Sequence, residues 1–161
     1  MLRPARPQDN AQIAAIWNHE AVATVATTET QPRTPAAQRA WLARRRRDHP
    51  VVVIVDGDEI LAFGALSPYR LKPAYERTVE DSVYVKAGHR DKGLGGLVLD
   101  RLVALARERG HHSIVARITS VNAPSLRLHE RHGFARAGVE REIAFKLGAW
   151  LDVVTMQRLI G

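Results

Sequence analysis

Two apolar runs joined by a turn signal dominate the middle of the chain. Residues 51–55 are consecutive β-branched residues, and residues 60–66 form a second, largely apolar run. Between them stands Asp56-Gly57, a dipeptide typical of tight β-hairpins. A continuous β-branched run of this length is typical of a buried strand. The sequence therefore predicts a pair of buried antiparallel strands.

Helix and strand signals alternate along the rest of the chain. Further strands are expected at residues 2–5, 78–85, 113–118, 139–145 and 151–159. Helices are expected to begin at Asp9, at Pro35 behind the N-cap Thr34, at Leu94 and after Asn122. The second helix is expected to run into Arg44–Arg47, the third to end at Gly110 and the last at Gly133. This order predicts an α+β fold with a mixed sheet packed by helices.

The composition is that of one ordinary globular domain. Of 161 residues, 45% are hydrophobic and 25% charged, so we expect a single domain spanning residues 1–161. The chain has no cysteine, which excludes disulfides, thiolate metal sites and a cysteine nucleophile. The first residues lack the apolar core of a signal peptide, and no run approaches the roughly 20 apolar residues that span a bilayer. We therefore expect a cytoplasmic protein without a membrane partner.

Positive charge is in excess and is carried mainly by arginine. Lysine and arginine number 24 against 17 acidic residues, a formal charge of +7, and 20 of the 24 are arginine. Arginine binds phosphate and carboxylate groups through two parallel hydrogen bonds. The excess predicts an anionic partner, such as a nucleic acid, a phospholipid or a phosphorylated small molecule. A general compositional bias toward arginine would explain the same excess.

A basic, glycine-bearing turn at residues 88–96 separates a predicted strand from a predicted helix. Exposed backbone N–H groups and the helix dipole at such a position favour an anion. The turn is not a Walker loop, because Leu94 and Gly95 stand where lysine and serine or threonine are required. It is not a dinucleotide fingerprint, because Val98 replaces the last glycine. The remaining pattern, Arg90-x-x-Gly93-x-Gly95, suits a pyrophosphate; a plain glycine-rich helix start is the alternative.

Three further stretches, together with this turn, match a known family. They are residues 78–85 (TVEDSVYV), 125–134 (SLRLHERHGF) and 150–157 (WLDVVTMQ). In these stretches the chain resembles the GNAT acyl-CoA N-acetyltransferases, and within them the phosphinothricin and methionine sulfoximine acetyltransferase branch. The similarity covers nearly the whole chain. It implies a central twisted, mostly antiparallel sheet flanked by helices, and an enzyme that moves the acetyl group of acetyl-CoA directly to an amine without a metal.

The resemblance also implies where acetyl-CoA binds. The backbone of residues 83–85 would pair with the pantetheine arm as an added strand does. Turn N–H groups would bind the pyrophosphate, with charge from Arg90 or Lys92, and the Asn122 amide would hold the far end of the pantetheine. The full set of expected donor-site residues is Val83, Tyr84, Val85, Arg90, Asp91, Lys92, Gly93, Leu94, Gly95, Gly96, Asn122 and Ser125.

The transfer needs a neutral amine, and amino groups near pH 7 are largely protonated. The family places its proposed base at the third position of Thr78-Val79-Glu80, so the resemblance implies that Glu80 is the general base, directly or through water. Residue type alone would make Glu80 an ordinary ion-pair partner. His129 stands where many relatives carry a tyrosine, and is the candidate acid for the departing thiolate. A packed, hydrogen-bonded histidine is the alternative.

The resemblance places the acceptor against the loop of residues 69–77. Arg70 and Lys72 suit a carboxylate or phosphinate, and Tyr75 and Glu80 complete the expected acceptor contacts. Glu76 occupies a position that often carries arginine in the branch, and Arg77 beside it is a candidate to compensate. The implied acceptor is the α-amino group of a small amino acid or amino-acid analogue, and its identity stays open.

Other functions fit parts of the sequence. Arg44–Arg47 invites nucleic-acid binding, but four consecutive arginines on a helix point in several directions without interleaved aromatics, so a solvated helix end is expected. The acceptor could instead be a protein N-terminus or a lysine side chain, although the loop of residues 68–77 is expected to roof a small pocket. A GNAT-like binding module without turnover is a third reading. The branch further implies a homodimer, with the strands from Trp150 onward as candidates for its interface.

Overall fold

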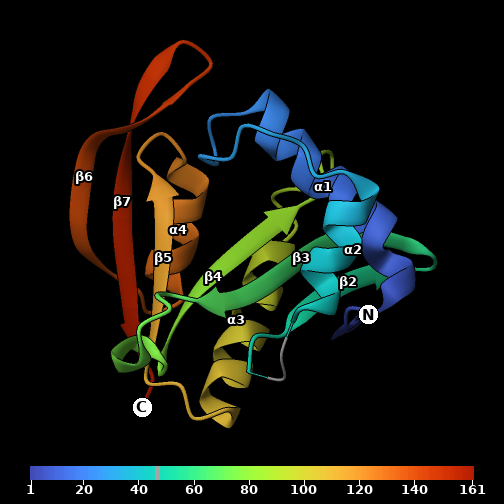
Figure 1. Cartoon of the computed structure of the whole chain (residues 1–161), viewed down its shortest axis with the longest axis horizontal. Helices are drawn as coiled ribbons and strands as arrows, with labels where there is room; N and C mark the ends of the chain where they lie inside the picture. The colour runs from blue at the N-terminus through green and yellow to red at the C-terminus, as the bar shows by residue number, and fades with distance from the viewer. Residues whose placement is uncertain (46–47) are drawn as a thin grey trace.

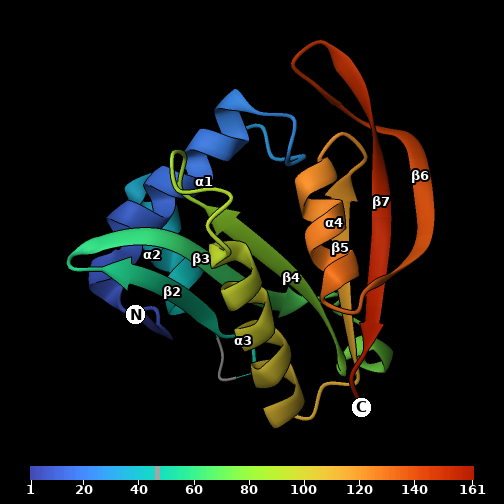
Figure 2. The ribbon, with the colours of Figure 1, turned by 180° about the vertical axis from the view of Figure 1, so that it is seen from behind.

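The computed structural model describes residues 1–45 and 48–161, and its elements follow the predicted order (Figure 1, and from behind in Figure 2). The strands are β1 (Leu2–Pro4), β2 (Val51–Asp56), β3 (Glu59–Pro68), β4 (Thr78–Val85), β5 (Ser113–Thr119), β6 (Ala135–Lys146) and β7 (Ala149–Leu159). The helices are α1 (Asn10–Ala23), α2 (Pro35–Ala43), α3 (Leu94–Glu108) and α4 (Ala123–Arg131), with short 3-10 helices η1 (Pro7–Asp9) and η2 (Pro73–Tyr75). The predicted mixed α+β fold is confirmed.

The predicted hairpin forms strands β2 and β3, which lie between β1 and β4 in the sheet. β2 and β3 pair antiparallel, with Val51 opposite Ala65. Alternate β2 residues serve two cores: Val52 and Ile54 pack with the α3 side chains, whereas Val53 packs with Ile13 and Trp17 of α1. Every residue of the β-branched run is therefore buried because helices cover both faces of the sheet.

The sheet opens between β4 and β5. Its strand order is β1-β2-β3-β4-β5-β7-β6, and β4 and β5 run parallel whereas the other pairs are antiparallel. Pairing between β4 and β5 is limited to Thr78–Glu80 against Ser113–Val115. Beyond Glu80 the two strands diverge, as Figure 1 shows. The edge of residues 81–85 that faces β5 therefore has no strand partner within the described part of the chain.

Local signals set the helix ends as predicted in two places. The Thr34 hydroxyl accepts a hydrogen bond from the Ala37 amide at 3.1 Å, which confirms the N-cap of α2. Gly93 has a φ of 76°, a left-handed conformation that glycine adopts without strain, and α3 begins directly after it. Each helix in residues 1–45 and 48–161 is too short or too polar to serve as a membrane span.

The arginine run differs from the predicted solvated helix end. α2 already ends at Ala43, and Arg46 and Arg47 lie outside the described residues. The Arg45 guanidinium lies 4.1 Å from the centre of the Trp41 ring and donates to the Leu66 carbonyl at 3.0 Å and the Ser67 hydroxyl at 2.9 Å. Burial, helped by neighbouring arginines, lowers the pKa of Arg45 to about 10. Arg45 is a structural cation that ties the end of α2 to β3.

Candidate active site

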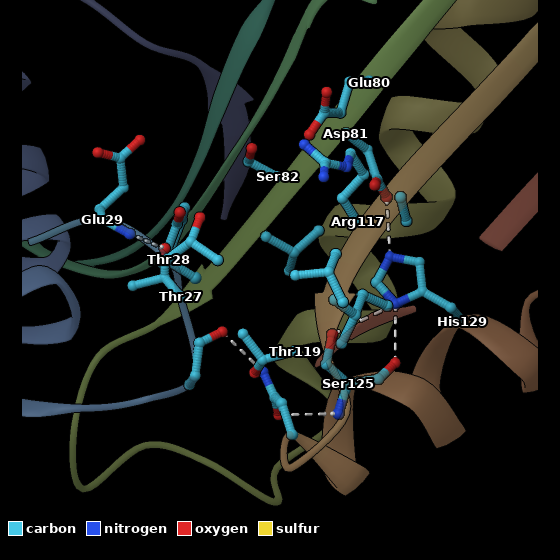
Figure 3. A pocket seen from close by; sticks show the side chains of 17 residues that line it. Thr27, Thr28, Glu29, Glu80, Asp81, Ser82, Arg117, Thr119, Ser125 and His129 are labelled. Atoms are coloured by element: carbon cyan, nitrogen blue, oxygen red, sulfur yellow. Dashed lines mark hydrogen bonds and ion pairs between the residues drawn. The ribbon is translucent and has the colours of Figure 1, made fainter. Parts of the chain in front are cut away.

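A cavity of about 170 Å³ lies where β4 and β5 separate (Figure 3). Its walls come from residues 80–84 of β4 and 116–119 of β5. The segment of residues 26–29 after α1, three residues at the start of α4 or within it (Asn122, Ser125 and His129), and Val153 of β7 complete the lining. Polar and charged side chains line most of this wall, so the cavity suits a polar or charged substrate.

Neighbouring residues of β4 reach the cavity from opposite faces of the sheet. Val79 packs in the core beside α3, and strand alternation places Asp81 on that same face and Glu80 on the other. Asp81 accordingly meets His129 of α4. Because the two strands are apart here, both carboxyl groups line one cavity. The opening in the sheet thus brings together groups that a continuous sheet would keep on separate faces.

Glu80 has the environment of a general base. It is only partly exposed, and burial raises the pKa of its carboxyl above the ordinary glutamate value. The charges of Arg117 and Arg70 oppose this rise, and the Asp81 carboxylate adds to it. A carboxylate with a raised pKa is a better proton acceptor for an ammonium ion than an ordinary one.

His129 and Asp81 form a buried ion pair. The Nε2 atom of His129 lies 2.9 Å from Oδ2 of Asp81, and Nδ1 lies 2.8 Å from the Ser125 carbonyl oxygen. Carboxylate and carbonyl oxygens only accept, so both ring nitrogens must carry protons and the ring is an imidazolium. Burial lowers the pKa of His129, but the hydrogen bond and charge of Asp81 outweigh it, and the net pKa is raised. The side chain of His129 is 4% exposed.

The glycines of the turn at residues 88–96 differ in their surroundings. A side chain at Gly93 would meet open space, so a ligand can approach the backbone closely at this residue. A Cβ at Gly95 would lie 3.2 Å from Leu128, and one at Gly96 would lie 3.1 Å from His132, so these glycines let α3 pack closely on α4. Asp91 has a φ of 60°, which completes a turn whose amides precede the N-terminus of α3.

Two predicted donor-site side chains are held by internal contacts. Arg90 forms an ion pair with the buried Glu20 of α1. The Asn122 side chain accepts from the Ser125 amide at 3.3 Å and donates to the Ala26 carbonyl at 3.3 Å, so it caps α4. Lys92 is exposed. The charge on this turn is therefore partly neutralised by α1.

The cavity is covered by the segment after α1 rather than by the predicted loop. The Thr119 hydroxyl donates to the Val25 carbonyl at 2.8 Å, and the Lys146 ammonium donates to the Thr27 carbonyl at 2.9 Å. These bonds hold residues 26–29 over the opening. In Figure 3 this segment, with Glu29, lies across the cavity from His129.

Residues 68–77 do not line the cavity within the described structure. Arg70, Lys72 and Tyr75 are all exposed, although the charge of Arg70 still lowers the pKa of Glu80. The Arg77 side chain donates to the Gly110 carbonyl at 3.1 Å, just beyond the C-terminal end of α3. The predicted acceptor loop directly precedes Thr78–Glu80, the part of β4 that is still paired with β5.

Several cavity residues were not predicted from the sequence. Arg117 is the main one, and Asp81, Ser82 and the segment 26–29 are others. A charged residue inside the apolar strand 113–118 is a visible signal in the sequence. Its place beside Glu80 depends on the parallel register, which the sequence does not display.

Within residues 1–45 and 48–161, no three histidine, aspartate or glutamate side chains are grouped so as to hold a metal ion.

The model of the Acetyltransferase (GNAT) family matches residues 12–134. The L-methionine sulfoximine/L-methionine sulfone acetyltransferase of Pseudomonas paraeruginosa is 38% identical, over 97% of this chain and 92% of the relative.

Two solved structures are closely similar in fold. The phosphinothricin acetyltransferase of Sinorhizobium meliloti, in complex with AcCoA, superposes with a TM-score of 0.96 at 31% identity, over 100% of this chain and 88% of that chain. The ribosomal-protein-alanine N-acetyltransferase of Brucella melitensis superposes with a TM-score of 0.95 at 31% identity, over 99% of both chains. The two proteins share the fold and differ in the acceptor that each name gives.

Proposed function

The chain belongs to the acetyltransferase (GNAT) family, and from this premise we propose that it acetylates the α-amino group of a small amino acid or an analogue of the phosphinothricin or methionine sulfoximine kind. The observation that carries the proposal is the unpaired edge of β4 beside Glu80, which opens into a small polar cavity. Acetyl-CoA is the acetyl donor of the family. A cavity of this size fits a small acceptor better than an extended peptide.

The donor would lie along the opening in the sheet. Residues 83–85 pair with β3 on one edge only, so their other edge offers backbone groups to the pantetheine amides. The open backbone at Gly93 and the free N–H groups at the start of α3 suit a pyrophosphate. Bound acetyl-CoA supplies an activated acyl group as its thioester. Val83, Tyr84, Val85 and the turn would hold that thioester near Glu80.

Glu80 is proposed as the general base. The ammonium of the acceptor would give a proton to the Glu80 carboxylate, directly or through a water molecule. The neutral nitrogen then forms a bond to the acetyl carbon while the carbon–sulfur bond breaks, and the thiolate leaves. Once bonded to the acetyl carbon, the nitrogen loses a second proton, which the thiolate takes up directly or through water, and Glu80 returns the first proton to the solvent. No residue of this chain needs to carry the acetyl group.

For His129 we propose a positioning role. Both of its protons are held by internal acceptors, and the ring packs edge-on against Phe134 with centroids 5.0 Å apart. The imidazolium joins β4 to α4 across the opening, and so fixes the distance between the donor edge and the helix. Donation of a proton to the thiolate would break the pair with Asp81.

We further propose that residues 1–161 form one acetyltransferase domain that acts as a homodimer. Apolar side chains on the β6–β7 hairpin are 52–62% exposed: Val139, Ile143, Phe145, Leu147 and Trp150. β6 is also an edge strand, which exposes unpaired backbone groups. An apolar surface on a sheet edge suits a second copy of the chain. A cytoplasmic location stays a prediction.

An acceptor panel tests the proposed function. The protein is mixed with acetyl-CoA and, in turn, methionine sulfoximine, phosphinothricin, common amino acids, a peptide with a free N-terminus and a lysine with a blocked α-amino group. Thiol release is followed. We expect release with one or more free amino acids or analogues. Release only with the peptide or the blocked lysine would favour a protein acceptor, and no release with any amine would leave a binding module.

A further inference from the structure

Arg117 is a charged residue in the interior of the sheet. β5 lies between β4 and β7, and Arg117 is its single exposed residue. The side chain is 40% exposed, and it lines the cavity. Its guanidinium therefore stays in contact with water while it faces the space between β4 and β5.

Arg117 and Glu80 share one face of the opened sheet. Glu80 pairs with Val115 in the parallel register, and Arg117 follows two residues later, so its side chain points to the same face as that of Val115. Figure 3 shows the guanidinium beside the Glu80 carboxyl group. The positive charge of Arg117 also lowers the pKa of Glu80. A carboxylate and a guanidinium thus stand together at the point where the acceptor must react.

Part of the hydrogen-bonding capacity of Arg117 is committed in the structure. Its Nη2 atom donates to Oε1 of Glu140 on β6 at 2.7 Å, and Glu140 is its hydrogen-bonded partner among the described residues. Both side chains of the pair are substantially exposed, 40% and 48%. Exposed pairs of this kind contribute little stability. A guanidinium has several further N–H donors, and it binds a carboxylate through two of them.

We propose that Arg117 binds the carboxylate of the acceptor while Glu80 accepts a proton from its amino group. A free α-amino acid carries an ammonium and a carboxylate on one carbon, which matches a carboxylate and a guanidinium placed side by side. The inference rests on the proposed function and narrows it. A peptide N-terminus or a lysine side chain has no carboxylate beside its amine, so it would offer no acceptor to the remaining N–H donors of the Arg117 guanidinium. Arg117 therefore selects free amino acids.

Steady-state kinetics with matched acceptors test this role. The acceptors are methionine sulfoximine and its carboxamide, in which the carboxylate is replaced by a neutral group. For Arg117→Ala we expect the KM of the free acid to rise by about tenfold or more, because a charge-assisted contact is lost. The KM of the carboxamide and the affinity for CoA should stay near those of the wild type. Arg117→Lys should restore part of the preference for the acid.

Two variants separate this role from a structural one. Arg101→Ala removes an arginine of equal exposure, 40%, that pairs with Glu108 on α3, and it should leave all constants unchanged. Glu140→Gln frees Arg117 from its partner, and it should leave the KM of the acid unchanged or lower it. If Arg117 only clamps β6 to β5, Glu140→Gln would raise that KM as Arg117→Ala does, and the inference would be wrong.

Other results would also overturn the inference. They are equal use of acid and carboxamide by the wild type, or an unchanged acid KM in Arg117→Ala. Absence of turnover with every acceptor would instead refute the proposed function. In that case calorimetry of methionine sulfoximine with the CoA-bound protein, wild type against Arg117→Ala, still tests the contact, and equal affinities would contradict it.

Discussion

At the scale of the residue, the site depends on two adjacent carboxyl groups with different surroundings. Glu80 faces Arg117 and holds a raised pKa through burial, whereas Asp81 faces His129 and is paired. Strand alternation separates them, and the divergence of β4 from β5 lets both reach one cavity. This difference supports the proposal that Glu80 takes the proton of the acceptor, whereas Asp81 joins β4 to α4 through His129.

Replacement of Glu80 by glutamine is expected to lower kcat by about a hundredfold, in the range of lost general-base catalysis. The affinity for acetyl-CoA should change little. In the wild type, activity should fall with decreasing pH through a pKa that lies above the ordinary glutamate value, because burial raises it. That limb should be absent in Glu80→Gln. The control is Glu108→Gln, an exposed partner on α3.

An acidic limb that Glu80→Gln leaves in place would remove Glu80 as the base. The free enzyme is best probed through kcat/KM over the acidic range, since this parameter reports groups of the unbound protein. A limb that disappears only together with the affinity for acetyl-CoA would also contradict the assignment.

Replacement of His129 by glutamine should destabilise the fold by about 3 kcal/mol, because it leaves Asp81 buried without its partner. The pKa of His129 is raised in the folded protein. The pair therefore contributes its full stability below the unfolded histidine pKa and loses it as pH rises through the folded value. The stability difference between wild type and variant should shrink over that rise. Urea unfolding at several pH values measures it, with His19→Gln, at an exposed position of α1, as the control.

A stability difference that grows with pH would contradict the imidazolium assignment. Turnover separates the two roles proposed for the ring. A positioning residue should affect KM for acetyl-CoA as well as kcat, whereas loss of an acid alone should lower kcat with an unchanged KM.

At the scale of the element, the glycine turn and the unpaired edge of β4 are the proposed donor site. A substitution of Gly93 by alanine is expected to weaken CoA binding by about tenfold, because the Cβ would stand where the pyrophosphate approaches and the left-handed φ would be strained. Calorimetry with CoA measures the effect. Gly57→Ala is the matched control, since Gly57 also has positive φ and open space but lies in the β2–β3 turn.

Equal CoA affinity in wild type and Gly93→Ala would show that the pyrophosphate binds elsewhere. A loss shared by Gly57→Ala would indicate general destabilisation, and a thermal melt of both variants recognises it.

Features that depend on neighbouring residues in the chain could be predicted from the sequence. Contacts that depend on how strands and helices come together could not. Thr34 caps its helix and Asp56-Gly57 closes its hairpin because each acts on its own neighbours in the chain. Arg45 differs from the predicted solvated arginine because its hydrogen-bond acceptors, Leu66 and Ser67 at the end of β3, come close to it only in the folded protein. Arg117 meets Glu80 through the parallel pairing of two strands that are separated by a whole helix. No local pattern in the sequence shows that these two side chains lie close together.

The roles implied by resemblance have a similar division. Glu80 and residues 83–85 lie on β4, the strand that the motif itself spells out, and their roles in the reaction stay proposals. The acceptor loop was placed by analogy alone, and the cavity is covered by residues 26–29 instead. That segment is held by Thr119 and Lys146, which stand far from it in the sequence.

At the scale of the whole molecule, we expect the proposed dimer to use the β6–β7 hairpin. Light scattering at assay concentration should give twice the mass of the chain. Trp150→Lys should shift the mass toward one chain, because a charge would replace an apolar side chain that is 62% exposed. Val22→Lys, at an exposed apolar position of α1, should leave the dimer intact.

A wild-type protein with the mass of one chain would contradict the dimer. A Trp150→Lys variant that remains dimeric would move the interface to another surface, because a buried lysine at a close contact is costly.

The most direct test of direct acetyl transfer is a count of both products. The protein is incubated with acetyl-CoA labelled in the acetyl group and with methionine sulfoximine, and the thiol and the labelled amino acid are measured together. We predict equal amounts of free CoA thiol and of product labelled on the α-nitrogen, with no label on the protein. Thiol release without labelled amino acid, or label that stays on the protein, would contradict this account.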